Sequence, residues 1–99
     1  MNSAALHNTA PSAWVVRGAL TFDTVPGLWQ QTADWLKGQV PLTIDLAEVG
    51  LIDSAGLALL LGWQGRAQVA GLTLRYQNLP QRLLALASIT DTQTLLTGG

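Results

Sequence analysis

The sequence predicts one small α/β domain, in which a mixed β-sheet of about four or five strands packs against about four helices. The first observation is the length of 99 residues, which is enough for a single hydrophobic core. The second is the composition: 48% of the residues are hydrophobic and 11% are charged, which excludes an intrinsically disordered chain. The third is that short segments of period two alternate with longer segments of helical period, as in a sheet covered by helices.

The N-terminal half begins with a polar segment and continues with strands around one helix. Residues 1–12 are rich in Asn, Ser, Thr, Ala and Pro, so we expect a flexible tail before a single domain at 13–99. Asp23 or Thr24 is placed to cap a helix that has Pro26 in its first turn and ends at Gly38. The strands expected in this half cover residues 14–17, 19–22 and 42–46.

The C-terminal half is dominated by a long helix. After a loop at 47–50 and two strand residues, Leu51-Ile52, the helix is expected to open at Asp53-Ser54 and to end at Gly71. A further strand is expected at 72–76, and Leu79-Pro80 marks the start of a third helix that ends near Ser88.

Charge and residue usage exclude several classes of function. The formal net charge is −1 with no basic patch, so the sequence offers no surface for nucleic acid. There is no cysteine, and the only histidine, His7, lies in the polar tail, so we predict no catalytic residue, no metal ligand and no cofactor. The longest strongly apolar stretch, 55–63, is too short to span a membrane, and no signal peptide is recognisable, so we expect a cytoplasmic protein without direct membrane insertion.

The segment from strand 42–46 into the long helix carries the most information. It presents a carboxylate, Asp53, and a hydroxyl, Ser54, at the positive end of the helix dipole. A phosphate on Ser54 would meet the same unpaired N–H donors, and Gly56 would let another backbone or a nucleotide approach closely. The simpler reading of Asp53-Ser54 is a helix N-cap.

This segment resembles the central motif of the STAS domain, the fold shared by bacterial anti-sigma-factor antagonists and the cytoplasmic tails of sulfate transporters. The resemblance rests on the strand Ile44-Asp45-Leu46, on Val49, and on Asp53-Ser54-Ala55-Gly56-Leu57 at the start of a leucine-rich helix. Within this family the chain is most similar to the MlaB-type subunit of the inner-membrane ABC transporter that maintains outer-membrane lipid asymmetry. The run Pro26-Gly27-Leu28-Trp29 and the run Ala58-Leu59-Leu60-Leu61-Gly62-Trp63 favour that branch.

The resemblance implies a non-enzymatic subunit that binds the cytoplasmic ATPase of a phospholipid ABC transporter, and is held at the inner membrane through this partner. It places partner binding at the start of the long helix, at Asp53, Ser54, Ala55, Gly56, Leu57 and Leu61. The alternative is an anti-sigma-factor antagonist whose partner is an anti-sigma serine kinase that phosphorylates Ser54.

Two sets of apolar residues leave alternatives open. Leu57 and Leu61 form either an exposed edge for a partner or a surface buried under the adjacent loop. Trp14, Trp29 and Trp63 lie on apolar stripes and are read as core residues or as interface residues, whereas Trp35 is expected to be partly exposed.

Overall fold

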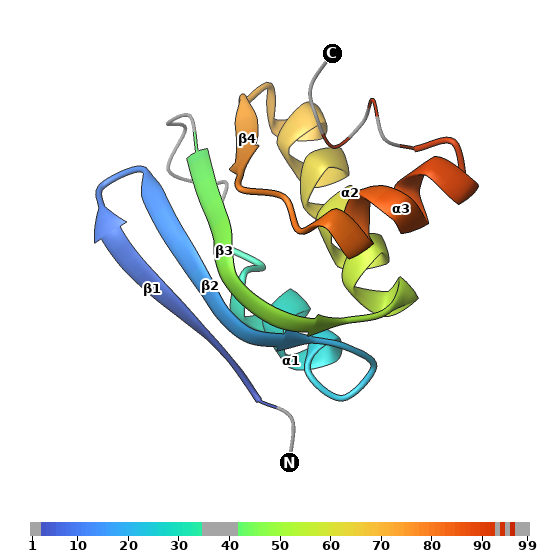
Figure 1. The fold of residues 1–99 in the computed structure, drawn as a ribbon. Coiled ribbons are helices and arrows are strands. Elements are labelled where there is room, and N and C mark those ends of the chain that lie inside the picture. Colours follow the sequence, from blue (N-terminus) through green and yellow to red (C-terminus); the bar gives the residue numbers. More distant parts are fainter. Residues whose placement is uncertain (1–2, 35–41, 93, 95, 97–99) are drawn as a thin grey trace.

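The computed structural model of the chain describes residues 3–34, 42–92, 94 and 96. Its sheet has four strands in the order β1-β2-β3-β4, which Figure 1 shows from left to right. The strands are β1 (Ala4–Ala10), β2 (Ala13–Leu20), β3 (Leu42–Ile52) and β4 (Leu74–Gln77). The helices are α1 (Val25–Gln31), α2 (Ser54–Ala70) and α3 (Gln81–Ile89). The α/β class and the mixed sheet predicted from the sequence are confirmed.

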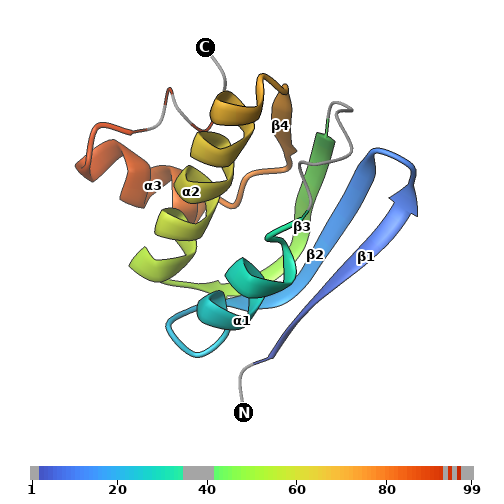
Figure 2. The ribbon, with the colours of Figure 1, turned by 180° about the vertical axis from the view of Figure 1, so that it is seen from behind.

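The sheet is mixed because its N-terminal hairpin is antiparallel and its later strands are connected by helices. β1 pairs antiparallel with β2, whereas β2 with β3 and β3 with β4 are parallel. One face of the sheet is covered: along β3, Leu42, Ile44 and Leu46 are buried, while the alternating Thr43 and Asp45 are only half-buried. Figure 2 shows α1 in front of β2 and β3 on the covered side, with α2 beside it.

The core lies between this face and the helices. Its largest side chain is the Trp63 indole on α2, which is 1% exposed. The other large, fully buried side chains come from all layers of the fold: Leu20, Ile44, Leu46, Leu60, Leu83, Leu96, Val16 and Thr32. No helix in the described ranges is long and apolar enough to cross a membrane.

The helix boundaries agree with the sequence most closely at α2. Asp53 is its N-cap, and Gly71 ends it with φ 71° and ψ 24°, the left-handed conformation that glycine adopts without strain. α1 begins after Thr24, as expected, but it ends at Gln31 instead of continuing toward Gly38. The predicted helix end and Trp35 lie outside the described residues.

The flexible tail predicted for residues 1–12 is wrong for residues 4–10, which form β1. β1 is an edge strand whose Ala4 and Leu6 pack against the core while its remaining side chains are exposed, so it needs little apolar sequence. Gly18 of β2 allows this pairing, because it has φ +95° and any Cβ at this position would clash with the Ser3 carbonyl oxygen.

The loop predicted at 47–50 is also wrong, because β3 is one continuous strand. Its pairing with β2 shifts register twice, between Asp45 and Glu48 and between Val49 and Ile52, and each shift places one extra residue in β3. Such bulges break the period-two pattern by which a strand is recognised in a sequence. The break predicted at Gly18 is likewise absent, since β2 runs through it.

Candidate functional site

The start of α2 lies where β3 ends, and Asp53 organises it. Its Oδ1 accepts hydrogen bonds from the backbone N–H groups of Ala55 (2.8 Å) and Gly56 (3.4 Å). Its Oδ2 accepts one from the N–H of Phe22 (3.2 Å), in the loop between β2 and α1. The carboxylate thus caps the helix and fixes the neighbouring loop at the same time, so the capping role predicted for it is confirmed.

Ser54 is the first residue of α2 and is exposed. Since the cap is supplied by Asp53, the Ser54 hydroxyl has no hydrogen-bond partner among the described residues. The guanidinium of Arg82, on α3, lies close to this end of the helix, where its Nε donates to the Ile52 carbonyl oxygen (3.1 Å). The serine side chain is therefore available to a partner without any rearrangement of the cap.

Gly56 is buried, and the backbone that approaches it closely belongs to the chain itself. A Cβ at this position would lie 2.7 Å from the Leu20 carbonyl oxygen and 2.8 Å from the Ile52 side chain. The glycine therefore lets α2 pack closely on the ends of β2 and β3. The space beside Gly56, which the sequence predicts for another backbone or a nucleotide, is occupied by Leu20 and Ile52 of the chain itself.

The remaining predicted site residues, Ala55, Leu57 and Leu61, differ in how deeply they are buried. Ala55 is half-buried beside Ser54. Leu57 is 5% exposed and belongs to the core, so the interpretation of Leu57 as an exposed, partner-facing residue is wrong: this side of α2 faces the sheet. Leu61 is half-buried and lies along a groove of about 430 Å³ that continues toward β4 past Gln64 and Gln68.

A second hollow lies next to Ser54 along α2. Ala58, one helical turn from Ser54, is exposed and lines an apolar hollow of about 270 Å³ together with Val25 and Trp29 of α1. The Trp29 ring lies against Gly62, where a Cβ would come within 2.8 Å of it. We refer to Phe22, Val25, Trp29, Ser54 and Ala58 as the Ser54 face.

Sequence reasoning missed Phe22, Val25 and Ala58 as site residues, and placed Trp29 on an apolar stripe read as core or interface. Phe22 is 72% exposed and Trp29 is 37% exposed. The sequence predicts Phe22 as the end of a strand at 19–22, because the alternation there gives no sign that the strand stops at Leu20. A large exposed aromatic residue on a loop that is tied to the start of α2 is the signal that only the structure provides.

The Ser54 face offers apolar contacts and a hydrogen bond from the Ser54 hydroxyl. His7 lies on β1 opposite Val15, and no hydrogen bond joins it to Ser54. Within the described ranges, His, Asp and Glu side chains form no cluster of three that would hold a metal ion. What the geometry does offer is an exposed hydroxyl, an apolar hollow that begins one helical turn further along α2, and an exposed aromatic residue, Phe22, on the loop that Asp53 ties to the start of the helix.

Comparisons with known proteins agree on the fold. No match was found among the curated proteins. A solved structure of the anti-sigma factor antagonist SpoIIAA in its unphosphorylated form is similar in fold, with a TM-score of 0.72 at 14% sequence identity. The match covers 95% of this chain and 85% of that one. The family model described as "Mlab, STAS domain" matches residues 6–97. The match spans nearly the whole chain, from β1 past the end of α3, and the chain therefore belongs to the MlaB-type STAS-domain family.

Proposed function

We propose that this chain is a non-enzymatic subunit that binds the cytoplasmic ATPase of a phospholipid ABC transporter through the Ser54 face. The observation that carries the proposal is the exposed Ser54 hydroxyl, left free because Asp53 caps α2, with Phe22 72% exposed on the adjoining loop. Membership of the MlaB-type family supports the choice of an ABC transporter as the partner system.

The arrangement of the Ser54 face suits recognition by a folded protein. Trp29, which is 37% exposed and lines the hollow, is of the residue type most enriched among those that dominate binding energy at protein interfaces. Asp53 holds the Phe22 loop and the first turn of α2 together, so little ordering is needed when a partner binds. We infer a preformed surface whose hydroxyl supplies one oriented hydrogen bond and whose apolar part supplies the buried area.

The Asp53 cap favours docking of unmodified Ser54 over binding of a phosphoserine, and the nearby Arg82 already donates its Nε–H to the Ile52 carbonyl oxygen. The N–H groups of Ala55 and Gly56, which would stabilise a phosphate, already donate to the Asp53 carboxylate. A phosphate on Ser54 would add a charge of about −1.5 to −2 next to that carboxylate. Repulsion between the two groups would loosen the cap and the Phe22 loop, so phosphorylation of Ser54 would act against docking.

The test is to measure binding of the purified chain to the ABC ATPase that co-purifies with it from detergent-solubilised cells. Phe22→Ala should weaken binding at least about tenfold, because it removes an exposed aromatic contact from the Ser54 face. Ile89→Ala is the matched control: Ile89 is 82% exposed on α3, away from the start of α2, and its truncation should leave binding unchanged.

Charge at Ser54 gives the second arm of the same experiment. Ser54→Glu should weaken binding at least about tenfold through bulk and repulsion from Asp53, whereas Ser88→Glu, at an exposed serine of α3, should have no effect. Equal affinity of the wild-type chain and of the Phe22 and Ser54 variants would refute docking through this face.

The second candidate is an anti-sigma-factor antagonist, favoured by the fold similarity to SpoIIAA and by the free Ser54 hydroxyl. Under this alternative the chain co-purifies with a serine kinase, and ATP leads to phosphate on Ser54 that mass spectrometry locates. Recovery of an ATPase with its permease and no such kinase would reject it.

A further inference from the structure

The outer edge of β1 carries backbone groups that the fold does not use. The N–H of Ala19 donates to the Ser3 carbonyl oxygen (2.8 Å), which marks Ser3 and Ala19 as a hydrogen-bonded pair. Hydrogen-bonded and non-bonded pairs alternate along an antiparallel ladder. The N–H and C=O groups of Ala4, Leu6 and Asn8 therefore point away from β2, to an edge where the described residues place no further strand.

This edge lacks the features that usually prevent an exposed edge strand from pairing with another chain. Proteins protect such edges with Lys, with proline, with inward-pointing charges or with very short strands. β1 is seven residues long and contains no proline and no Asp, Glu, Lys or Arg. Only the register shift between Asn8 and Ala10 interrupts it, which leaves residues 4–8 as a regular, uncharged edge.

The edge is complementary to itself. When two copies of β1 run antiparallel about a twofold axis at Leu6, Ala4 lies opposite Asn8 of the second copy and Leu6 lies opposite its counterpart. All three outward-facing residues of each strand then belong to hydrogen-bonded pairs. On the helix-facing side the two Leu6 side chains, each half-buried against its own core, would cover one another.

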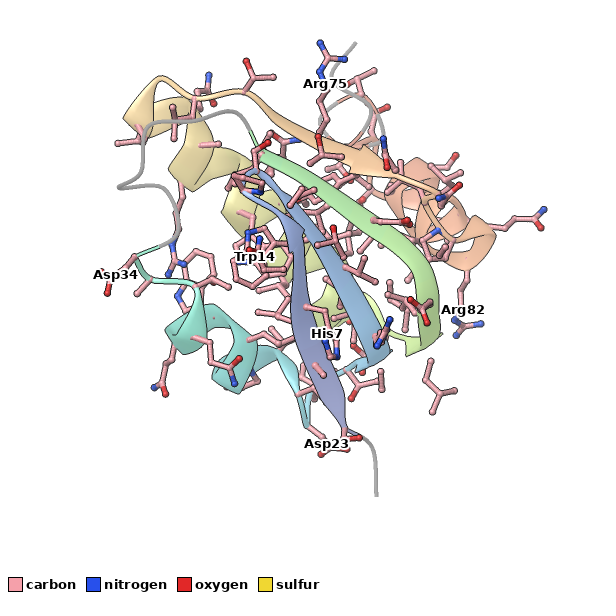
Figure 3. The ribbon with its side chains drawn as sticks, turned by 90° about the vertical axis from the view of Figure 1, so that its left-hand side faces the viewer. His7, Trp14, Asp23, Asp34, Arg75 and Arg82 are labelled. Carbon is pink, nitrogen blue, oxygen red and sulfur yellow. The ribbon has the colours of Figure 1, made fainter. Side chains whose placement is uncertain are left out.

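We propose that this chain forms a homodimer by antiparallel pairing of two β1 edges, which joins two four-stranded sheets into one. A second copy is favoured over a foreign peptide for two reasons. The twofold pairing uses the outer β1 edge of both copies, so the assembly is complete as a dimer. The strand also has no Asp, Glu, Lys or Arg that would repel its own copy. Figure 3 looks onto this edge and labels His7 on it, and Figure 1 shows β1 and the start of α2 on opposite sides of the domain. The dimer thus leaves the Ser54 face free.

The first test is sedimentation of the purified full chain from about 1 μM to about 1 mM. The mass should rise from 10.5 kDa toward twice that value with concentration. Two charge variants share the same changed positions and differ only in the sign at His7. Ala5→Glu with His7→Lys should keep the dimer, because position 5 lies opposite position 7 of the second copy. Ala5→Glu with His7→Glu should abolish it.

Both variants place the same carboxylate opposite Arg17 on β2, so within one chain they differ only at position 7. If the Glu/Glu variant unfolds, its circular dichroism spectrum reveals this, and the register is then decided by cross-linking. The chain has no cysteine of its own. An Ala5→Cys chain mixed with a His7→Cys chain should form disulfide-linked dimers, since non-bonded pairs have Cα atoms about 4.5 Å apart, within disulfide range.

Each cysteine variant alone should cross-link far less, because equal residues lie diagonally in this register. A chain that stays at 10.5 kDa over the whole concentration range would overturn the proposal. So would a dimer that persists in the Glu/Glu variant, or one in which each cysteine variant cross-links as well alone as in the mixture.

Discussion

Two glycines of α2 show how differently single residues bear on the same helix. A Cβ at Gly56 would lie 2.7 Å from the Leu20 carbonyl oxygen, whereas a Cβ at Gly65 would meet nothing within 4 Å. Alanine at Gly56 has to push backbone apart, and overpacking of this kind costs about 1–3 kcal/mol. Gly56→Ala should therefore lower the free energy of unfolding by that amount in urea denaturation.

Gly65→Ala is the control, and it should act in the opposite direction. With open space at this position, alanine gains up to about 1 kcal/mol of helix propensity over glycine. If the two variants shift the free energy of unfolding equally, the close contact between α2 and the end of β2 does not exist as described.

At the same scale, the sequence predicts the residues whose role is local. Asp53 can be assigned as a cap and Gly71 as a helix end because both roles depend on neighbours along the chain. The burial of Leu57 and the exposure of Phe22 depend on how α2 and the loop before α1 are placed on the sheet. The types and spacing of the residues along the chain do not determine how α2 and this loop are placed on the sheet, so the burial of Leu57 and the exposure of Phe22 could not be predicted.

Among the elements, α1 and α2 are joined by a polar cluster inside an apolar interface. The buried Thr32 hydroxyl accepts hydrogen bonds from Trp63 Nε1 (2.8 Å) and from Arg66 (3.3 Å). The Arg66 guanidinium also lies over the Trp29 ring, 3.1 Å from its centre, and donates to the Trp29 carbonyl oxygen. This cluster holds one wall of the Ser54 face in position.

Thr32→Val keeps the shape of the side chain but removes the acceptor of both hydrogen bonds. Loss of a buried partner costs about 1–3 kcal/mol, so we expect urea denaturation to show a destabilisation in this range. Thr32→Ser retains the hydroxyl and should lose less. A valine variant as stable as the wild-type protein would mean that the hydroxyl contributes nothing to the packing of α1 on α2.

The sequence predicts the helices that have their own boundary signals and misses the elements defined by pairing. α2 and α3 are expected close to their observed positions, since Asp53 and Gly71 mark the two ends of α2 and Pro80 precedes α3. β1 was not expected, because its register comes from β2 and from the space above Gly18. The bulged half of β3 was missed because its regularity comes from its pairing with β2.

Over the whole molecule, the edge strand β4 is fastened to α2 by two side-chain hydrogen bonds. Tyr76 Oη donates to the Leu60 carbonyl oxygen (2.6 Å), and Gln64 Nε2 donates to the Leu74 carbonyl oxygen (3.1 Å). Both bonds connect the sheet directly to its covering helix, and Gln64 and Leu74 also line the groove beside Leu61. The protonated phenol is therefore part of what keeps the two layers together.

Burial of the phenol raises the pKa of Tyr76 well above its ordinary value of 10.0. The folded state thus holds this proton more tightly than the unfolded state, whose tyrosine titrates near pH 10. The resulting stabilisation is complete below about pH 10 and is lost as the pH rises toward the pKa of the folded state, so the free energy of unfolding should fall with increasing alkalinity. Tyr76 is the only tyrosine of the chain, so the phenolate absorbance reports on it alone. We expect this absorbance to stay low past pH 10 while circular dichroism is native, and to rise together with unfolding. Tyr76→Phe should abolish the absorbance change and flatten this part of the stability curve. A phenolate that forms near pH 10 in a fully folded protein would show that the Tyr76 hydroxyl is not held between the two layers.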